Sequence, residues 1–188
     1  MLPSGHFAAG YLASTALIKI ADTNLNSGQM NLIVLLGTFS AIAPDIDLIY
    51  YFIRKKQNKL KKNENHRFYP THAPILWFVI SLGIYLIGGN EFYRMVGLSV
   101  FIGSFSHFLL DSIEFGVPWL WPISKKLIAF RKMPDPSSKD QGIIRSQFEF
   151  ITKTYPKMLT SFIEVLIIAS ALIIFLTPHL NASTNINF

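Results

Sequence analysis

The chain has 188 residues, which predicts a single domain, and it contains no cysteine, which excludes disulfides and thiolate metal sites. Its hydrophobic fraction of 51% is close to that of soluble proteins, but the apolar residues lie in long blocks separated by polar segments. The formal net charge of +6 comes from basic residues that flank these blocks, so it indicates membrane topology and gives no reason to expect a nucleic-acid partner.

A helix that crosses the bilayer needs about 20 mostly apolar residues. We therefore predict an all-α, multi-pass membrane helix bundle with about five spans, at about 4–21, 31–53, 73–89, 93–115 and 159–177. The first block is short and rich in Ala, Gly and Ser, which suits close helix packing, although such a segment could also lie in the interface. Residues 1–180 are taken as one membrane-embedded domain.

The basic residues give an independent test of this topology. Fifteen of the 17 Lys and Arg lie between the second and third spans or between the fourth and fifth, and five spans place both segments on one side. The positive-inside rule makes that side cytoplasmic, with the N-terminus inside and the C-terminus outside. We expect the loop at about 116–158 to lie in the cytoplasmic interface, with a short helix at 143–156, and the tail 181–188 to be frayed.

Several ionisable residues occur in or beside the apolar blocks, where they are costly and therefore indicate function. The set that falls on the predicted cytoplasmic side consists of His6, Asp45, Asp47, His66, His72, His107 and Asp111. Imidazole with carboxylate suits Zn²⁺, Mn²⁺ or Fe²⁺, and seven such groups are enough for one or two divalent ions. Glu114 and Glu164 are expected to reach lipid headgroups or basic side chains instead.

The spacing of these residues supports one site. His107 and Asp111 are four residues apart and share a helix face, and both could bind a metal or form a structural hydrogen bond. Asp45 and Asp47 would diverge on a regular helix, but Pro44 before them favours a local break that could turn both carboxylates inward. The alternative is a turn or capping role for this pair. His66 could be a solvated loop residue.

Four segments together resemble the YdjM-type family of predicted inner-membrane metal-dependent hydrolases. They are His6 with Gly10, PDID at 44–47, HRFYPTH at 66–72, and SHFLLDSIEFGVPWLWPIS at 106–124. The resemblance implies a multi-pass protein of the bacterial inner membrane, with Arg67 and Thr71 in catalytic roles beside the seven metal ligands. The His66–Arg67 pair is separated from Thr71–His72 by Phe68, Tyr69 and Pro70, a wider spacing than in many members.

The resulting hypothesis is hydrolysis of a phosphoester, assisted by one or two metal ions with zinc as the first candidate, at the cytoplasmic membrane face. Arg67 could clamp a phosphate oxygen, although it could equally be a loop charge that sets topology. A phospholipid or another amphiphilic phosphoester would suit the depth of the site, with membrane lipids as surroundings. The alternatives are a metal or proton transporter that uses the same cluster, and a non-catalytic scaffold with a structural metal.

Overall fold

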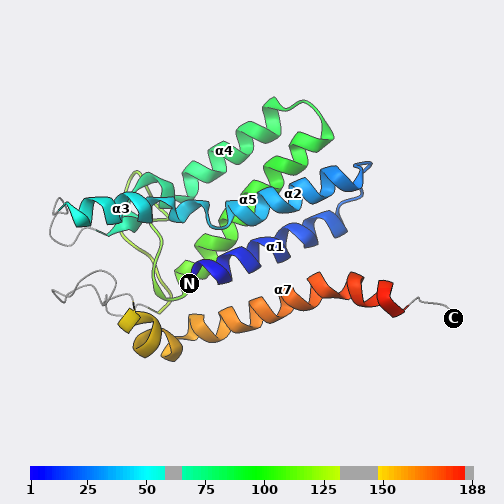
Figure 1. Ribbon diagram of the computed structural model, residues 1–188. Coiled ribbons are helices and arrows are strands. Elements are labelled where there is room, and N and C mark those ends of the chain that lie inside the picture. The colour runs from blue at the N-terminus through cyan, green and yellow to red at the C-terminus, as the bar shows by residue number, and fades with distance from the viewer. Residues whose placement is uncertain (58–64, 132–147, 185–188) are drawn as a thin grey trace.

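The computed structural model describes residues 1–57, 65–131 and 148–184, and within these ranges every regular element is helical except for one isolated bridge between Val117 and Ile128. Five long helices lie side by side (Figure 1). They are α1 (Pro3–Ile20), α2 (Ser27–Ser40), α4 (Pro74–Ile87), α5 (Glu91–Glu114) and α7 (Leu159–Thr184). The predicted all-α fold is confirmed.

Local sequence explains where several helices begin. Asn26 caps α2 and forms a capping box with Gln29, and Asn90 caps α5 by accepting a hydrogen bond from the Tyr93 N–H. A proline occupies the first turn of both α1 and α4, where a missing N–H costs nothing. Helices α1, α4 and α7 begin, and α2 and α5 end, at the same end of the bundle (Figure 1).

The second predicted span is broken. Helix α2 ends at Ser40, and a 3₁₀ turn, η1 (Ala43–Ile46), leads into α3 (Asp47–Lys56). The chain bends there by 51°. This is the break that Pro44 predicts, because proline lacks the N–H that would continue the helix.

Length and apolar composition identify α5 and residues Leu159–Thr177 of α7 as able to cross a membrane, and the bent pair around Pro44 adds a third candidate. A multi-pass helical membrane protein follows from this. Helix α1, with 18 residues, and α4, with 14, do not reach the same criterion, so five spans remains a prediction. The alternating directions of the five helices in Figure 1 are those that five spans require.

The structure describes part of the polar segments that connect the helices. Two short turns, η2 (His66–Phe68) and η3 (Pro70–His72), precede α4, and a π-helical turn, η5 (Phe150–Thr154), with η6 (Tyr155–Lys157), precedes α7. Within 143–156, where a short interfacial helix is expected, the described residues from 148 onward are helical, and 132–147 lie outside the described residues. That this segment lies in the interface stays a prediction. The first four residues of the expected tail belong to α7, and 185–188 also lie outside that description.

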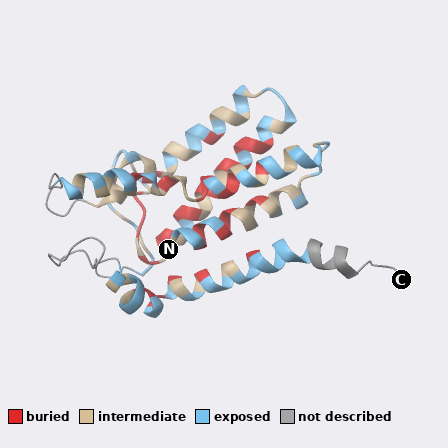
Figure 2. Cartoon of the chain, in the orientation of Figure 1, coloured by how far each residue is buried: buried red, intermediate tan, exposed pale blue. Residues whose placement is uncertain are grey.

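Helix α5 is the centre of the bundle and packs against α1, α2 and α4, whereas α7 packs chiefly on α1. Buried residues accordingly gather where α1, α2 and α5 meet, and most of α7 between Leu159 and Thr177 is exposed (Figure 2). Small residues allow the close contact. The Ser99 hydroxyl donates to the Ile33 carbonyl at 2.7 Å, and Gly103 lies directly against the backbone of Gly37.

Gly103→Ala is expected to destabilise the bundle by about 1–3 kcal/mol, because an added Cβ would overlap the carbonyl oxygen of Gly37 and backbone cannot yield cheaply. Gly83→Ala is the matched control on α4, since nothing lies within 4 Å of a Cβ there. Thermal unfolding in detergent measures both. Equal melting temperatures for the two variants would contradict this close helix contact.

Glu114 and Glu164 are not placed against lipid headgroups as expected, whereas the expected basic partner is found for Glu114, which interacts electrostatically with Arg131. Both are buried, and each caps the start of another helix. Glu114 accepts hydrogen bonds from the N–H groups of Leu159 and Thr160 and from the Thr160 hydroxyl, at the start of α7. A carboxylate at a helix N-terminus satisfies free N–H groups and meets the positive end of the helix dipole.

Glu164 does the same for α1. It accepts from the Ser4 hydroxyl at 2.6 Å and from the Gly5 N–H at 2.9 Å. The Tyr155 hydroxyl also donates to it, and burial together with this hydrogen bond raises the pKa of Tyr155. The two carboxylates therefore fix the starts of α1 and α7 at the end of the bundle that carries the histidines.

Candidate metal centre

All seven predicted metal ligands lie together at the end of the bundle where α1 begins and α5 ends. His6 comes from the first turn of α1, and His107 and Asp111 from the last turns of α5. The remaining four come from the short elements that follow α2 and precede α4: Asp45, Asp47, His66 and His72. Segments up to about 100 residues apart in the sequence thus meet at one place.

The ligands form two adjacent sets. In the first, Asp45, Asp47, His66 and His72 each offer one ligand atom, and these four atoms lie within 4.8 Å of one another. In the second, His6, His107 and Asp111 do the same. The break at Pro44 is what allows both aspartates to join the first set.

The two sets are in contact. The Nε2 atoms of His72 and His107 are 3.4 Å apart, and His72 Nε2 lies 3.6 Å from Asp111 Oδ2. His107 Nε2 is also 3.8 Å from Asp45 Oδ1. Two-metal hydrolytic sites hold their ions about 3.5–4 Å apart, so neighbouring sets of this kind have the required proximity.

The hydrogen bonds on the outer ring nitrogens determine which atoms face the centre. His107 Nδ1 lies 2.8 Å from the carbonyl oxygen of Ala41, which can only accept, so Nδ1 carries the proton. His72 Nδ1 lies 3.2 Å from Asp47 Oδ2 and donates in the same way. Nε2 of each ring then points into the cluster, where the two Nε2 atoms face one another at 3.4 Å. One can donate to the other only if one ring carries a second proton, and a bound cation would take the place of that proton.

Several buried atoms of the ligand sets lack a hydrogen-bond partner. They include His66 Nε2, Asp47 Oδ1 and both ring nitrogens of His6, although His6 Nε2 approaches Asp111 Oδ1 at 3.2 Å without hydrogen-bond geometry. Buried polar atoms are rarely left unpaired, and each such case needs an explanation. The side chains present therefore fit one or two divalent ions with imidazole and carboxylate ligands.

Two cationic groups pair with the Asp111 carboxylate. Its Oδ1 lies 2.8 Å from the Met1 ammonium, and its Oδ2 accepts from Arg67 Nε at 3.2 Å and Nη2 at 2.9 Å. Arg67 also stacks over the Phe115 ring, with 4.9 Å between its Cζ and the ring centroid. The structure thus places Arg67 beside the second ligand set, not in a solvated loop.

Two histidines outside the predicted spans have shifted pKa values. Burial and the neighbouring Arg67 guanidinium hold the pKa of His66 well below its usual range, so it is neutral, as a metal ligand must be. Burial lowers the pKa of His72, but hydrogen bonds with Asp111 and Asp47 outweigh this and raise it overall. The carboxylates around His72 therefore favour a positive charge at this position, which a bound ion would also supply.

Comparison with known proteins shows the family of the chain. The family model of the YdjM inner membrane protein matches residues 1–181. The chain belongs to the YdjM inner membrane protein family. It is accordingly an inner membrane protein, in keeping with its apolar helices. Among curated proteins and among solved structures no match is found.

In this member of the YdjM family, Thr71 forms a hydrogen bond with one of the predicted metal ligands. Its hydroxyl donates to Asp47 Oδ2 at 3.0 Å, and its carbonyl accepts from the Trp77 indole at 2.7 Å, which holds the turn in place. Thr71 is therefore a positioning residue for Asp47. Ala41 has a similar role toward His107, and sequence reasoning missed it because the contact is made by a backbone carbonyl, which no residue type signals.

Thr71→Val is expected to weaken metal binding about 10- to 100-fold, because groups that orient a metal ligand typically contribute this much. Thr71→Ser keeps the hydroxyl and should restore binding. Titration of the metal-free protein with zinc, followed by calorimetry in detergent, measures the effect. Wild-type affinity in Thr71→Val would remove Thr71 from the site.

Proposed function

We propose that this YdjM-family chain is a membrane-bound, metal-dependent hydrolase that acts on a phosphoester at the cytoplasmic membrane face. The observation that supports it most is that Nε2 of His72 and Nε2 of His107 both point to the contact between the two ligand sets, where they lie 3.4 Å apart. Divalent ions bound here would activate a water and offset the charge of a phosphate.

The side chains of the first set would hold one ion: Asp45, Asp47, His66 and His72. Those of the second would hold the other: His6, His107 and Asp111. A single ion at the contact between the sets would use His72 and His107. Zinc suits this mixture of imidazole and carboxylate best, and manganese and iron are the next candidates.

Arg67 supplies the group for substrate orientation. Its guanidinium carries five N–H donors, more than the two that Asp111 accepts, and its planar fork matches two phosphate oxygens. Since Arg67 lies beside the ligand sets, it would hold the phosphate next to the ions. Thr71 would act one step further out by orienting the Asp47 carboxylate.

A transporter with the same ligands is less well supported. Transporter sites commonly lie near the bilayer midplane, between repeated halves of the chain. Here the ligands lie at one end of the bundle, where α1 begins and α5 ends (Figure 1). A site at headgroup depth suits chemistry on a molecule that is presented at the membrane surface.

The test is turnover by the purified, metal-loaded protein with bis(p-nitrophenyl) phosphate and with short-chain phospholipids. Turnover should require metal and should fall by about two orders of magnitude or more in His107→Ala, because loss of a ligand removes the ion that stabilises the transition state. Arg67→Lys should lower kcat/KM about tenfold through loss of bidentate contact. Lys126→Ala, an exposed charge on the loop after α5, is the control.

Two results would overturn the proposal. Metal flux through proteoliposomes without turnover would favour the transporter. Bound metal with a closed ligand shell, and no turnover of any phosphoester, would favour a structural role.

A further inference from the structure

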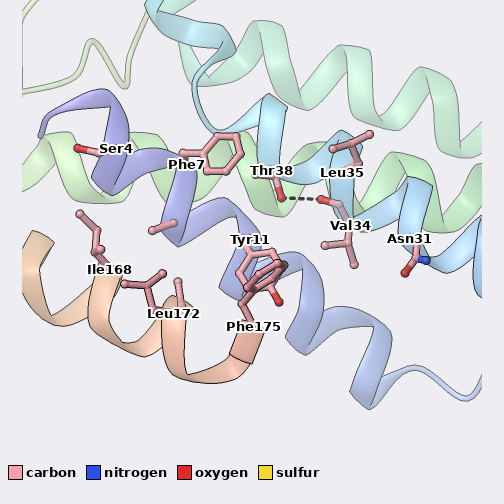
Figure 3. A pocket seen from close by; sticks show the side chains of 12 residues that line it. Ser4, Phe7, Tyr11, Asn31, Val34, Leu35, Thr38, Ile168, Leu172 and Phe175 are labelled. Carbon is pink, nitrogen blue, oxygen red and sulfur yellow. Dashed lines mark hydrogen bonds between the residues drawn. The ribbon is translucent and has the colours of Figure 1, made fainter. Parts of the chain in front are cut away.

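An apolar groove of about 520 Å³ runs between α1, α2 and α7 (Figure 3). Phe7 and Tyr11 of α1 form its floor, Leu35 lies on the α2 rim, and Leu172 and Phe175 lie on the α7 rim. The groove exists because α7 packs chiefly on α1 and leaves a gap toward α2. Its volume is within the range of about 300–1,000 Å³ that is typical of small-molecule sites.

The groove lies at the depth of the hydrocarbon. Its α7 rim belongs to the span Leu159–Thr177, and its α2 rim belongs to the bent pair that also meets the criterion for crossing a membrane. Few polar groups line the groove. Two of them are already used, since Ser4 donates to Glu164 and Thr38 donates to the Val34 carbonyl, and the others are the Tyr11 hydroxyl and the Asn31 amide. A long apolar ligand suits such a lining better than a polar one.

One end of the groove is level with the metal centre. Ser4 and Phe7 lie on the first turns of α1, on either side of His6 in the sequence. On the opposite rim, Thr38 is one helical turn before Ala41, whose carbonyl accepts from His107. From this end the groove extends along α1 toward Asn31, near the start of α2 (Figure 3).

We propose that this groove binds an acyl chain of a bilayer lipid and brings the headgroup end of that lipid to the level of the metal centre. The chain enters sideways from the membrane between α2 and α7. The substrate class is then a phosphoester that carries a long acyl chain. This assignment of the substrate rests on the proposed hydrolase function, whereas binding of the chain does not.

The test uses a phosphatidylethanolamine with a diazirine in one acyl chain, which is cross-linked by light to the full-length protein in nanodiscs. Mass spectrometry should locate the label on the groove residues of α1, α2 and α7. Leu172→Trp should reduce this labelling severalfold, because the larger ring fills the groove from the α7 rim. Leu35→Trp should do the same from the α2 rim.

Each variant has a matched control. Ile173 is 66% exposed against 54% for Leu172, and Leu32 is 43% exposed against 49% for Leu35, but neither control lines the groove. Ile173→Trp and Leu32→Trp should therefore keep the wild-type labelling. These four side chains are all accessible to lipid, so a tryptophan at any of them is not expected to prevent folding.

The outcomes separate the groove from the chemistry. Even labelling of all lipid-facing helices, unchanged by Leu172→Trp, would overturn the proposal, and so would a cross-link that places a second copy of the chain in the groove. Groove labelling without hydrolysis would keep the chain-binding site and reject the hydrolase. If the groove variants lose turnover of a phospholipid but keep turnover of bis(p-nitrophenyl) phosphate, both proposals are supported.

Discussion

Asp111→Asn is expected to weaken metal binding at least about 100-fold, since it removes the only carboxylate of the second ligand set. It should also destabilise the fold by about 3–5 kcal/mol, because the Met1 ammonium and the Arg67 guanidinium would lose their buried anion. Zinc titration and thermal unfolding in detergent measure the two effects. Glu91→Gln, at the opposite end of α5, is the control: it should leave zinc binding unchanged and lower the stability by at most about 1 kcal/mol, the usual contribution of a charge at a helix start.

A second variant keeps the test informative if Asp111→Asn does not fold. His6→Ala removes a ligand from the same set but leaves the Asp111 charge and its two cationic partners in place. The protein should remain folded and bind zinc more weakly. Unchanged zinc affinity in both variants would contradict a metal site that includes the second set.

Glu164→Gln is expected to lower the stability of the bundle by roughly 3 kcal/mol or more, because a neutral amide would leave donors at the start of α1 without an acceptor. The carboxylate accepts from Ser4, Gly5 and Tyr155, and the amide NH₂ would face one of these donors. The melting temperature should fall, with α7 detaching first from α1. Ser170→Ala, on the exposed part of α7, is the control.

An unchanged melting temperature in Glu164→Gln would show that α7 is held by its apolar contacts alone. Zinc titration of the same variant tests whether the Glu164 cap also supports the metal centre. His6 lies two residues after Ser4, so release of the α1 start should also weaken the second ligand set.

The seven-residue cluster could be predicted because each member is unusual where it stands. A histidine or aspartate inside an apolar block is conspicuous, and the positions of Lys and Arg predict on which side of the membrane each lies. The four-residue spacing of His107 and Asp111 and the break at Pro44 are local features, so they too can be read from the sequence. Helix direction then brings the remaining ligands to the same end.

Contacts made through backbone could not be predicted in the same way. Glu114 and Glu164 are as conspicuous as the ligands, but their partners are N–H groups at the starts of distant helices, which look alike in any sequence. The Ala41 carbonyl beside His107 is hidden for the same reason. The groove depends on how far α7 stands from α2, and only tertiary packing determines that distance.

The most direct test of the metal centre is the metal content of the detergent-purified protein, measured by elemental mass spectrometry beside Asp47→Ala and His107→Ala. One or two equivalents of zinc, manganese or iron per chain, lost in both folded variants, is the expected result, because each variant removes a ligand of a different set. No bound metal after reconstitution with each of these ions would contradict the centre, and the buried histidines and aspartates would then be a hydrogen-bonded network or a proton path.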